Sequence, residues 1–314
     1  MSRNVTVGLD GTPESRAAAE WAAREARLRG VPLTLVHAWE PVSEPLAQAA
    51  LLEAGTWLGR SERGGTGAAP AADWGSIARE AAEGLRLRHP AVDVTVAHVS
   101  GRPADVLVDA AKDADLLVLG SRRTSGLAGF LVGSVGTAVI ALTDTPVVLV
   151  RAGEQAADEH VEDPAGIPSA ATAYRPVVLG VDTRSPGGAV LAFAFEEAAR
   201  RGTALRAVHG WNLPSYFAYG LPAAPGLDAE LGRRGAAALA EVLRPWREKY
   251  PDVPVTEESR AGGAAGHLVD AAGDASLVVV GRRIRRGRLG AHIGSVTHAV
   301  LHHATAPVAV VAHD

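Results

Sequence analysis

The chain has 314 residues, of which 47% are hydrophobic and 21% charged, and its formal net charge at pH 7 is -4. This length suits two domains of ordinary size. The small negative charge argues against a general binder of nucleic acid or of membrane surfaces. The absence of cysteine excludes disulfides, thiol catalysis and cysteine metal sites. Because the first residues carry no apolar signal region and no run approaches the roughly 18 apolar residues of a membrane helix, a cytoplasmic protein is expected.

Short apolar strands alternate with helices along the first half of the chain. Strands are predicted at residues 5–9, 33–38, 92–98, 116–119 and 147–151, and helices at 15–29, 47–58, 75–88, 103–112 and 134–142. Thr12 is the expected N-cap of the first helix, Pro13 occupies its first turn and Gly30 ends it. Apolar strands separated by helices predict a parallel sheet that is covered on both faces.

The second half repeats the first half block by block. Val-Gly-Leu-Asp at 7–10 returns as Leu-Gly-Val-Asp at 179–182, an offset of 172. Val-Leu-Gly-Ser-Arg at 118–122 returns as Val-Val-Gly-Arg-Arg at 279–283, an offset of 161. Strands are accordingly predicted at 177–181, 204–209, 255–259, 277–280 and 308–311. One fixed order of blocks, repeated once, indicates a tandem duplication of a domain.

The repeat also suggests where the domains begin and end. The change of offset from 172 to 161 indicates an insertion in the first copy, and its natural place is the Gly-, Ala- and Pro-rich stretch at about 61–72. Residues 152–174 are acidic and then small and polar, which is typical of a linker. We therefore predict a first domain at 1–151, a linker at 152–174 and a second domain at 175–314.

Three features recur where a ligand is expected. In an open parallel sheet, ligands bind beyond the carboxyl ends of the strands. An aspartate follows the first strand, a glycine follows the fourth, and a Gly-Ser pair opens the last helix: Asp10, Gly120 and Gly133-Ser134, then Asp182, Gly281 and Gly294-Ser295. The glycine lets a ligand approach the backbone, and the free amides of the helix start suit a phosphate. The aspartate is expected to face the ribose or base of a nucleotide.

At these residues the sequence resembles the universal stress protein family. The family pattern is Gly, two residues, Gly, nine residues, Gly, and then Ser or Thr. Both copies keep this spacing, with Arg123 and Ile284 in place of the second glycine, and the His-x-Trp of the second strand is also similar to the family. The resemblance covers both copies. It implies an α/β protein of two tandem, open, five-stranded parallel-sheet domains of the Rossmann-like, adenine nucleotide alpha hydrolase-like type, related by a pseudo-twofold axis.

The resemblance further implies a ligand and its site. The ligand would be ATP, or the related ADP or AMP, with Mg²⁺ as an optional companion. The matching positions are Asp10, Ala38, Leu119, Gly120, Gly133, Ser134 and Val135 in the first copy, and Asp182, Gly210, Val280, Gly281, Gly294, Ser295 and Val296 in the second. Arg123 either crowds the phosphates or pairs with them.

Family members commonly dimerise through their last strands. The resemblance therefore implies that the strands at 147–151 and 308–311 pair within this chain, with a homodimer as a further option. No binding of nucleic acid or membrane is expected.

The sequence lacks the parts of several enzyme classes. It has no Gly-Lys of a P-loop, no dinucleotide fingerprint, no nucleophile elbow and no carboxylate pair placed for acid–base work. At most, slow ATP hydrolysis is expected. His298 and His302 share a helix face, but no further ligand completes the set, so no metal site is expected.

Other polar and aromatic residues have simpler interpretations. The arginine-rich stretch at 282–288 is predicted to be a solvated loop. His37 and His209 are expected at strand ends, with each ring bonded to a backbone group. Trp39 and Trp211 are expected to pack in the core or against loops, with contact to adenine as a secondary option.

Two functions stay open. The first is a cytoplasmic stress-response regulator or sensor that binds ATP or a related nucleotide, because the Asp and Gly-Ser features occur twice. The second is a nucleotide-free scaffold for protein–protein contacts, because the second glycine of the motif is replaced in both copies.

Overall fold

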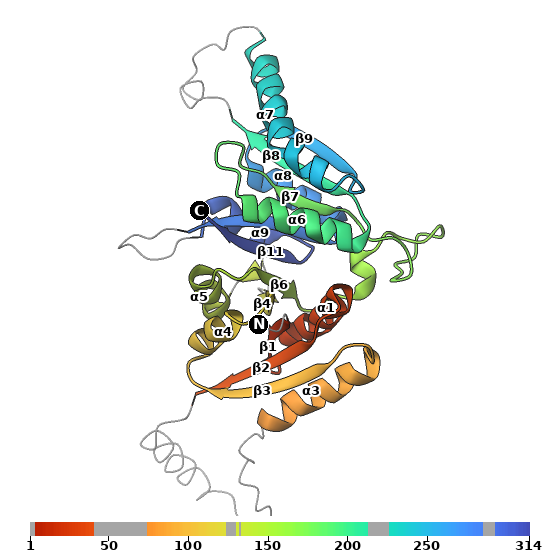
Figure 1. Cartoon of the computed structure of the whole chain (residues 1–314), viewed down its shortest axis with the longest axis vertical. Coiled ribbons are helices and arrows are strands. Elements are labelled where there is room, and N and C mark those ends of the chain that lie inside the picture. The colour runs from red at the N-terminus through yellow and green to blue at the C-terminus, as the bar shows by residue number, and fades with distance from the viewer. Residues whose placement is uncertain (1–3, 41–73, 124–129, 132, 213–225, 285–292) are drawn as a thin grey trace, which may run out of the picture.

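The structure is a computed structural model that describes residues 4–40, 74–123, 130–131, 133–212, 226–284 and 293–314. The molecule is elongated, with the first copy of the repeat at one end and the second copy at the other (Figure 1). The helix predicted at 47–58 and the insertion predicted at about 61–72 lie outside the described residues. In the described part, no helix combines the length and the apolar character needed to cross a membrane.

The first copy contains the alternating elements that its sequence predicts. The strands are β1 (Val5–Gly8), β2 (Leu33–Trp39), β3 (Val94–Ser100), β4 (Leu116–Arg123), β5 (Phe130–Leu131) and β6 (Val147–Arg151), and the helices are α1 (Pro13–Arg29), α3 (Trp74–Arg88), α4 (Pro103–Ala111) and α5 (Ser134–Leu142). Thr12 caps α1, since its side chain accepts a hydrogen bond from the Ser15 amide, and Gly30 ends the helix with a φ of 65°.

The second copy repeats these elements. Its strands are β7 (Val177–Gly180), β8 (Leu205–Trp211), β9 (Val255–Ala261), β10 (Leu277–Arg283) and β11 (Val308–His313), and its helices are α6 (Gly188–Arg201), α7 (Leu227–Lys249), α8 (Ala264–Ala271) and α9 (Ser295–His303). Short 3-10 turns occur at Ala156–Glu159 and Ala272–Asp274. Gly202 ends α6 in the same left-handed conformation that Gly30 adopts after α1.

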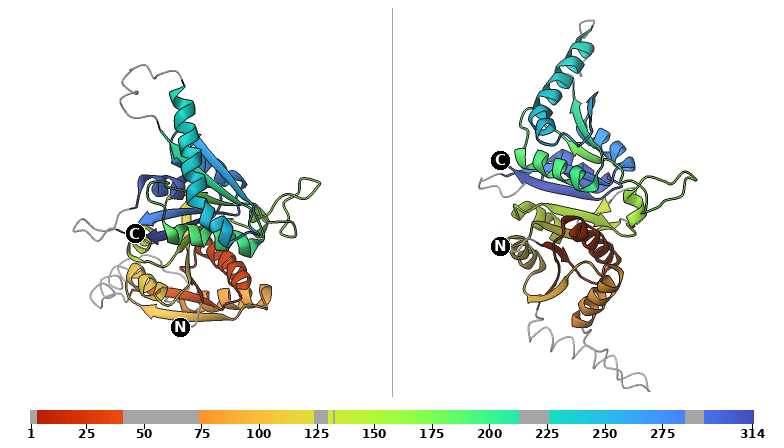
Figure 2. Two further views of the ribbon diagram at one scale, coloured as in Figure 1. Left: turned by 45° about the horizontal axis from the view of Figure 1, so that its top comes forward. Right: turned by 45° about the vertical axis from the view of Figure 1, so that its right-hand side comes forward.

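The strands form one sheet that runs through both copies. Its order is β3-β2-β1-β4-β6-β11-β10-β7-β8-β9, and the short β5 pairs with β4 outside this path. Every pairing along the path is parallel except that of β6 with β11, which is antiparallel at the centre of the molecule (Figure 2). The predicted pairing of the last strands within the chain is thus confirmed.

Several strands end later than their hydrophobic pattern predicts, and β4 and β3 show why. β4 continues beyond residue 119 to Arg123 because the backbone of Arg122 and Arg123 pairs with β5. β3 runs from Val94 to Ser100 because it follows β2 residue by residue, with Ser100 beside Trp39. In both cases the partner strand, and not the apolar pattern, decides where the strand stops.

Helices cover both faces of the sheet, as predicted. One hydrophobic core includes Trp21 of α1, Leu85 of α3, Phe195 of α6 and Leu239 of α7. The core on the opposite face includes side chains of the remaining helices, namely Leu107, Ile140, Leu268 and Leu301. Each core contains residues of both copies, so the two copies share their hydrophobic interior across the β6–β11 junction.

A buried cluster of four charges joins α1 to α6. Glu25 and Arg29 come from α1, and Glu197 and Arg201 occupy the same positions of α6 at the offset of 172. Arg29 donates to Glu25 at 2.6 Å and to Glu197 at 2.5 Å, while Arg201 donates to Glu25 at 2.7 Å and also pairs with Glu197. Each carboxylate therefore contacts both guanidinium groups. The pairing follows the pseudo-twofold relation between the copies.

Arg282 corrects the prediction of a solvated arginine loop at 282–288. It belongs to β10, is only 4% exposed, and donates to the carbonyl oxygen of Thr143 in the first copy at 2.7 Å. The aliphatic part of the Arg282 side chain and its guanidinium group are therefore part of the contact between the two copies. Arg283 is exposed, and residues 285–288 lie outside the described part.

Candidate functional site

A cavity of about 240 Å³ lies at the carboxyl ends of β1, β2 and β4. We call it the N-terminal pocket. It is lined by every first-copy position predicted from the sequence apart from Arg123, namely Asp10, Ala38, Leu119, Gly120, Gly133, Ser134 and Val135. The backbone of Arg123 ends β4, and its side chain lies outside the described part. The topology therefore gathers residues that are more than 120 positions apart in the sequence into one cavity.

The turn after β1 fixes the position of Asp10. Its carboxylate accepts hydrogen bonds from the Thr12 amide at 3.1 Å and from the Thr12 hydroxyl at 2.6 Å. The Asp10 amide donates to the hydroxyl of Ser15 at 3.3 Å. These bonds hold an exposed carboxylate at the rim of the pocket, between the strand end and the first turn of α1.

The opposite side of the pocket is the start of α5. Gly133 is the N-cap residue of α5, and no described side chain accepts a hydrogen bond from the first amides of the helix there. The pocket is lined by Gly133 and by Ser134, Val135 and Gly136 of the first turn. The first amides of a helix have no partner within the helix, and the helix dipole places partial positive charge there. This end of the pocket can accept an anionic group.

Apolar side chains complete the wall between these two ends. Val36 of β2 and Leu107 of α4 line the pocket together with Pro103, none of which was predicted as a site residue. Pro103 did carry a signal, because it is the first residue of α4, which begins at the carboxyl edge of the sheet; Val36 and Leu107 lie inside their strand and helix. The family pattern alone did not single them out.

A second cavity, of about 330 Å³, lies at the corresponding edge of the second copy. We call it the C-terminal pocket. It is lined by six of the seven predicted positions, namely Asp182, Val280, Gly281, Gly294, Ser295 and Val296. Gly210 is not among the described residues that line it, because Gly210 packs against the start of α8: a Cβ there would lie 2.6 Å from the Ala264 nitrogen.

A guanidinium and an imidazole distinguish the C-terminal pocket from the N-terminal pocket, whose described charged lining is acidic. Arg283 and His313 line it, and neither was predicted as a site residue. The guanidinium of Arg283 lies 3.6 Å from the Asp182 carboxylate. His313 is the last residue of β11, and its carbonyl oxygen accepts a hydrogen bond from the Ile284 amide at 2.6 Å.

The aromatic and histidine candidates lie outside both pockets in the described part. Trp39 is 46% exposed, and Trp211 packs against Gly235 of α7, with 3.2 Å between its indole and a Cβ built there. A ring nitrogen of His209 lies 3.1 Å from the carbonyl oxygen of Val181, which is the predicted backbone contact. The ring of His37 lies edge-on to that of His98, and burial, followed by His98, lowers the pKa of His37.

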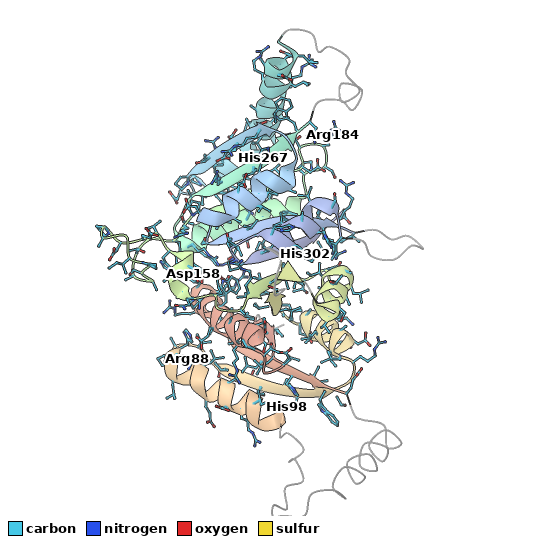
Figure 3. The ribbon with its side chains drawn as sticks, turned by 180° about the vertical axis from the view of Figure 1, so that it is seen from behind. Arg88, His98, Asp158, Arg184, His267 and His302 are labelled. Atoms are coloured by element: carbon cyan, nitrogen blue, oxygen red, sulfur yellow. The ribbon has the colours of Figure 1, made fainter. Side chains whose placement is uncertain are left out.

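The rings of His298 and His302 lie against each other on α9, tilted by 39° and with 4.3 Å between their centroids, and Figure 3 shows His302 near the level where the two copies meet. Burial lowers the pKa of His298, and its neighbours His302 and His303 add to the effect. Within the described ranges, no group of three or more His, Asp or Glu residues is arranged to hold a metal ion.

The comparison with known proteins follows the two halves of the fold. The family model described as "Universal stress protein family" matches residues 1–151 and again residues 173–312. The chain belongs to the universal stress protein family. Two tandem domains of this family therefore build the ten-stranded sheet, and each contributes one of the two pockets.

Family members of similar length are known. Universal stress protein Rv2005c of Mycobacterium tuberculosis is 35% identical over 98% of this chain and 96% of its own length. The crystal structure of a universal stress protein from Archaeoglobus fulgidus shares the fold with a TM-score of 0.62, at 15% identity, over 99% of both chains. A universal stress protein solved in complex with cAMP covers 48% of this chain and 98% of its own, at 28% identity and a TM-score of 0.34.

Proposed function

We propose that the N-terminal pocket binds an adenine nucleotide, ATP or the related ADP or AMP, and that the protein acts as a nucleotide-dependent regulator or sensor in a stress response. The observation that carries this proposal is the convergence of seven family positions on one cavity, with a carboxylate at one end and an uncapped helix start at the other.

The two ends of the pocket suit the two ends of a nucleotide. The Asp10 carboxylate is an acceptor for ribose hydroxyls or for the amino group of adenine, and it disfavours phosphate. The amides of Ser134, Val135 and Gly136 suit the phosphates. Val36, Ala38 and Leu107 offer an apolar wall to the flat base.

The steric freedom of Gly133 supports a ligand at this end. A Cβ built on Gly133 would meet no atom of the described residues within 4 Å, and the φ of Gly133 is -60°, a value open to any residue. The described residues therefore give no steric reason for glycine at this position. Close approach of a phosphate to the backbone would give one.

A matched pair of variants tests the proposal. ATP with Mg²⁺ is titrated calorimetrically into the nucleotide-stripped full chain, into Asp10→Ala and into Asp182→Ala. Each aspartate accepts a hydrogen bond from the amide two residues further on, so the two variants disturb similar turns. We expect Asp10→Ala to weaken ATP binding by about tenfold or more, the effect of losing a charge-assisted hydrogen bond.

Asp182→Ala is expected to retain the wild-type ATP affinity. Equal losses in both variants, or a loss only in Asp182→Ala, would contradict the assignment to the N-terminal pocket. No binding by the wild type at millimolar ATP would favour the nucleotide-free scaffold.

A further inference from the structure

The two pockets differ at the helix that follows the first strand. α1 begins at Pro13, so the offset of 172 would place the start of α6 at Ser185, yet α6 begins at Gly188. Pro186 and Gly187, which correspond to Glu14 and Ser15, remain outside the helix. The second copy therefore lacks the first helical turn that borders the N-terminal pocket.

The imidazole of His313 takes the place of that missing turn. In the first copy, a Cβ on Gly120 would lie 2.7 Å from the Ser15 nitrogen, because the start of α1 rests on this glycine. In the second copy, a Cβ on Gly281 would lie 2.8 Å from Nε2 of His313, and one on Gly187 would lie 2.7 Å from its Cγ. The ring is thus held between two glycines.

The position of His313 is filled differently in the first copy. The offset of 161 assigns Ala152 to it, which has no polar side chain. The second copy therefore has both an imidazole at position 313 and Gly187 in place of Ser15. Among the described lining residues, a titratable ring occurs in the C-terminal pocket and not in the N-terminal pocket.

The β2 wall of the N-terminal pocket has no counterpart in the described lining of the C-terminal pocket. Val36 and Ala38 of β2 line the N-terminal pocket, but their counterparts Val208 and Gly210 are not among the described residues lining the C-terminal pocket. The cause is the approach of α8: a Cβ on Gly210 would lie 2.6 Å from both the nitrogen and the Cα of Ala264. Gly210 therefore packs directly on the start of α8, and among the described residues β8 contributes no side chain to the C-terminal pocket.

The remaining space is lined by cationic and donor groups. Arg283 places a guanidinium there, with its five N–H donors, and Ser295 adds a hydroxyl at the start of α9. The nearby Thr297 hydroxyl is already used, because it donates to the carbonyl oxygen of Gly281 at 2.8 Å. The Asp182 carboxylate would repel an anion, but Arg283 at 3.6 Å balances its charge. One contact at that distance leaves most donors of the guanidinium available among the described residues.

We propose that the C-terminal pocket is a separate site for a compact phosphorylated anion that carries no nucleobase, and that Arg283 and His313 determine this specificity. The site is independent of the nucleotide proposed for the N-terminal pocket. The duplication has then produced two sites with different ligands: a nucleotide in the first copy and a small phosphate compound in the second.

The test uses the imidazole as a reporter. The full chain is prepared with labelled histidine, and the NMR signal of His313 is assigned through His313→Gln. Pyrophosphate, inorganic phosphate and adenosine are titrated separately. We expect pyrophosphate, or phosphate at higher concentration, to shift the His313 signal saturably, whereas adenosine leaves it in place. A shift caused by adenosine, or no shift with any of the three, would overturn the proposal.

Charge variants test the role of Arg283. Arg283→Gln is expected to weaken pyrophosphate binding at the His313 signal by about tenfold, as for the loss of a charge-assisted contact. Arg244→Gln removes the same charge from the exposed face of α7 and is the matched control. Equal affinities in both variants would contradict the role of Arg283. Because the reporter lies in the C-terminal pocket, the result is read independently of ATP binding in the N-terminal pocket.

Discussion

Gly120 and Gly133 lie in the same pocket, but the structure requires glycine at only one of them. A Cβ on Gly120 would lie 2.6 Å from the carbonyl carbon of Glu14 and 2.7 Å from the Ser15 nitrogen, both backbone atoms of α1. On Gly133 it would meet no described atom within 4 Å. The sequence motif predicts both glycines for ligand approach, whereas the structure gives Gly120 a packing role.

The same substitution at the two glycines is expected to have different effects. Gly120→Ala should lower the free energy of unfolding by about 3 kcal/mol, because backbone atoms cannot move aside as a side chain can. Gly133→Ala should cost about 1 kcal/mol or less, the usual penalty for alanine at an N-cap. Urea denaturation of both variants measures the difference. Equal losses of stability would show that the close approach at Gly120 is not rigid.

Glu154 is a buried acid in the segment between the two domains. Its exposure is 9%, and burial, followed by the nearby Glu159 and Asp158, raises its pKa from 4.5 to about 8. Glu159 is itself paired with Arg24 of α1 at 2.6 Å. Figure 3 shows Asp158 at the level where the two domains meet. The sequence marks this segment as a linker by its acidity, and nothing in its composition predicts a buried acid.

This pKa sets a pH dependence of stability. The folded state holds the proton on Glu154, so its contribution is complete below pH 4.5 and is lost as pH rises through about 8. Glu154→Gln mimics the protonated form and should remove this loss. We expect the variant to gain about 2–4 kcal/mol over wild type between pH 5 and pH 8 in denaturant titrations. Glu162→Gln, at an exposed position of the same segment, should change nothing. A constant difference between Glu154→Gln and wild type across pH would refute the raised pKa.

At the scale of the elements, the least predictable feature is the charge cluster between α1 and α6. Glu25 and Arg29 are spaced as an ordinary exposed i,i+4 pair, and charged helix positions are normally solvated. The repeat does carry the signal, because Glu197 and Arg201 recur at the offset of 172. Only the antiparallel pairing of β6 with β11 brings the two pairs together.

The two arginines of this cluster compensate for the burial of Glu25, whereas burial and the nearby Glu25 raise the pKa of Glu197. Burial by itself would raise the pKa of Glu25, but Arg201 and Arg29 lower it to about 2. Removing one partner leaves the remaining charges buried and unbalanced, which costs about 3–5 kcal/mol in comparable systems. The cluster therefore makes α1 and α6 depend on each other.

Adjacent arginines on α6 allow a direct test. Arg201→Met should lower the free energy of unfolding by about 3–5 kcal/mol, since Arg201 contacts Glu25 and Glu197. Arg200→Met should cost about 1 kcal/mol, because the Arg200 side chain is 29% exposed and lies at the edge of the cluster. Chemical denaturation compares the two variants. Similar losses of unfolding free energy in the two variants would show that the ion pairs between α1 and α6 contribute little to stability.

The elements themselves were largely predictable from local chemistry. Thr12, Pro13 and Gly30 bound α1 as their residue types predict, and the apolar runs at 5–9 and 147–151 lie in strands of the sheet. Where the prediction differs, as at β4 and at Arg282, a partner distant in sequence decides the outcome. A local sequence pattern contains no information on such distant partners until the fold is known.

At the scale of the whole molecule, the duplication is symmetric in fold and asymmetric in its pockets. Both halves belong to the universal stress protein family and meet in one continuous sheet with shared cores. The sequence repeat predicts two similar sites because the motif residues of the two copies are alike. His313, Gly187 and Gly210 make the C-terminal pocket different, and each acts through packing that the motif does not include.

Photolabelling with 8-azido-ATP, followed by peptide mapping by mass spectrometry, tests the central claim most directly, because the azido group reports where the adenine ring lies. We expect label in peptides of the first copy, within residues 1–151, and its loss when unlabelled ATP competes. Label in residues 175–314 at a similar level, or no label that ATP can compete away, would contradict an adenine nucleotide site in the N-terminal pocket.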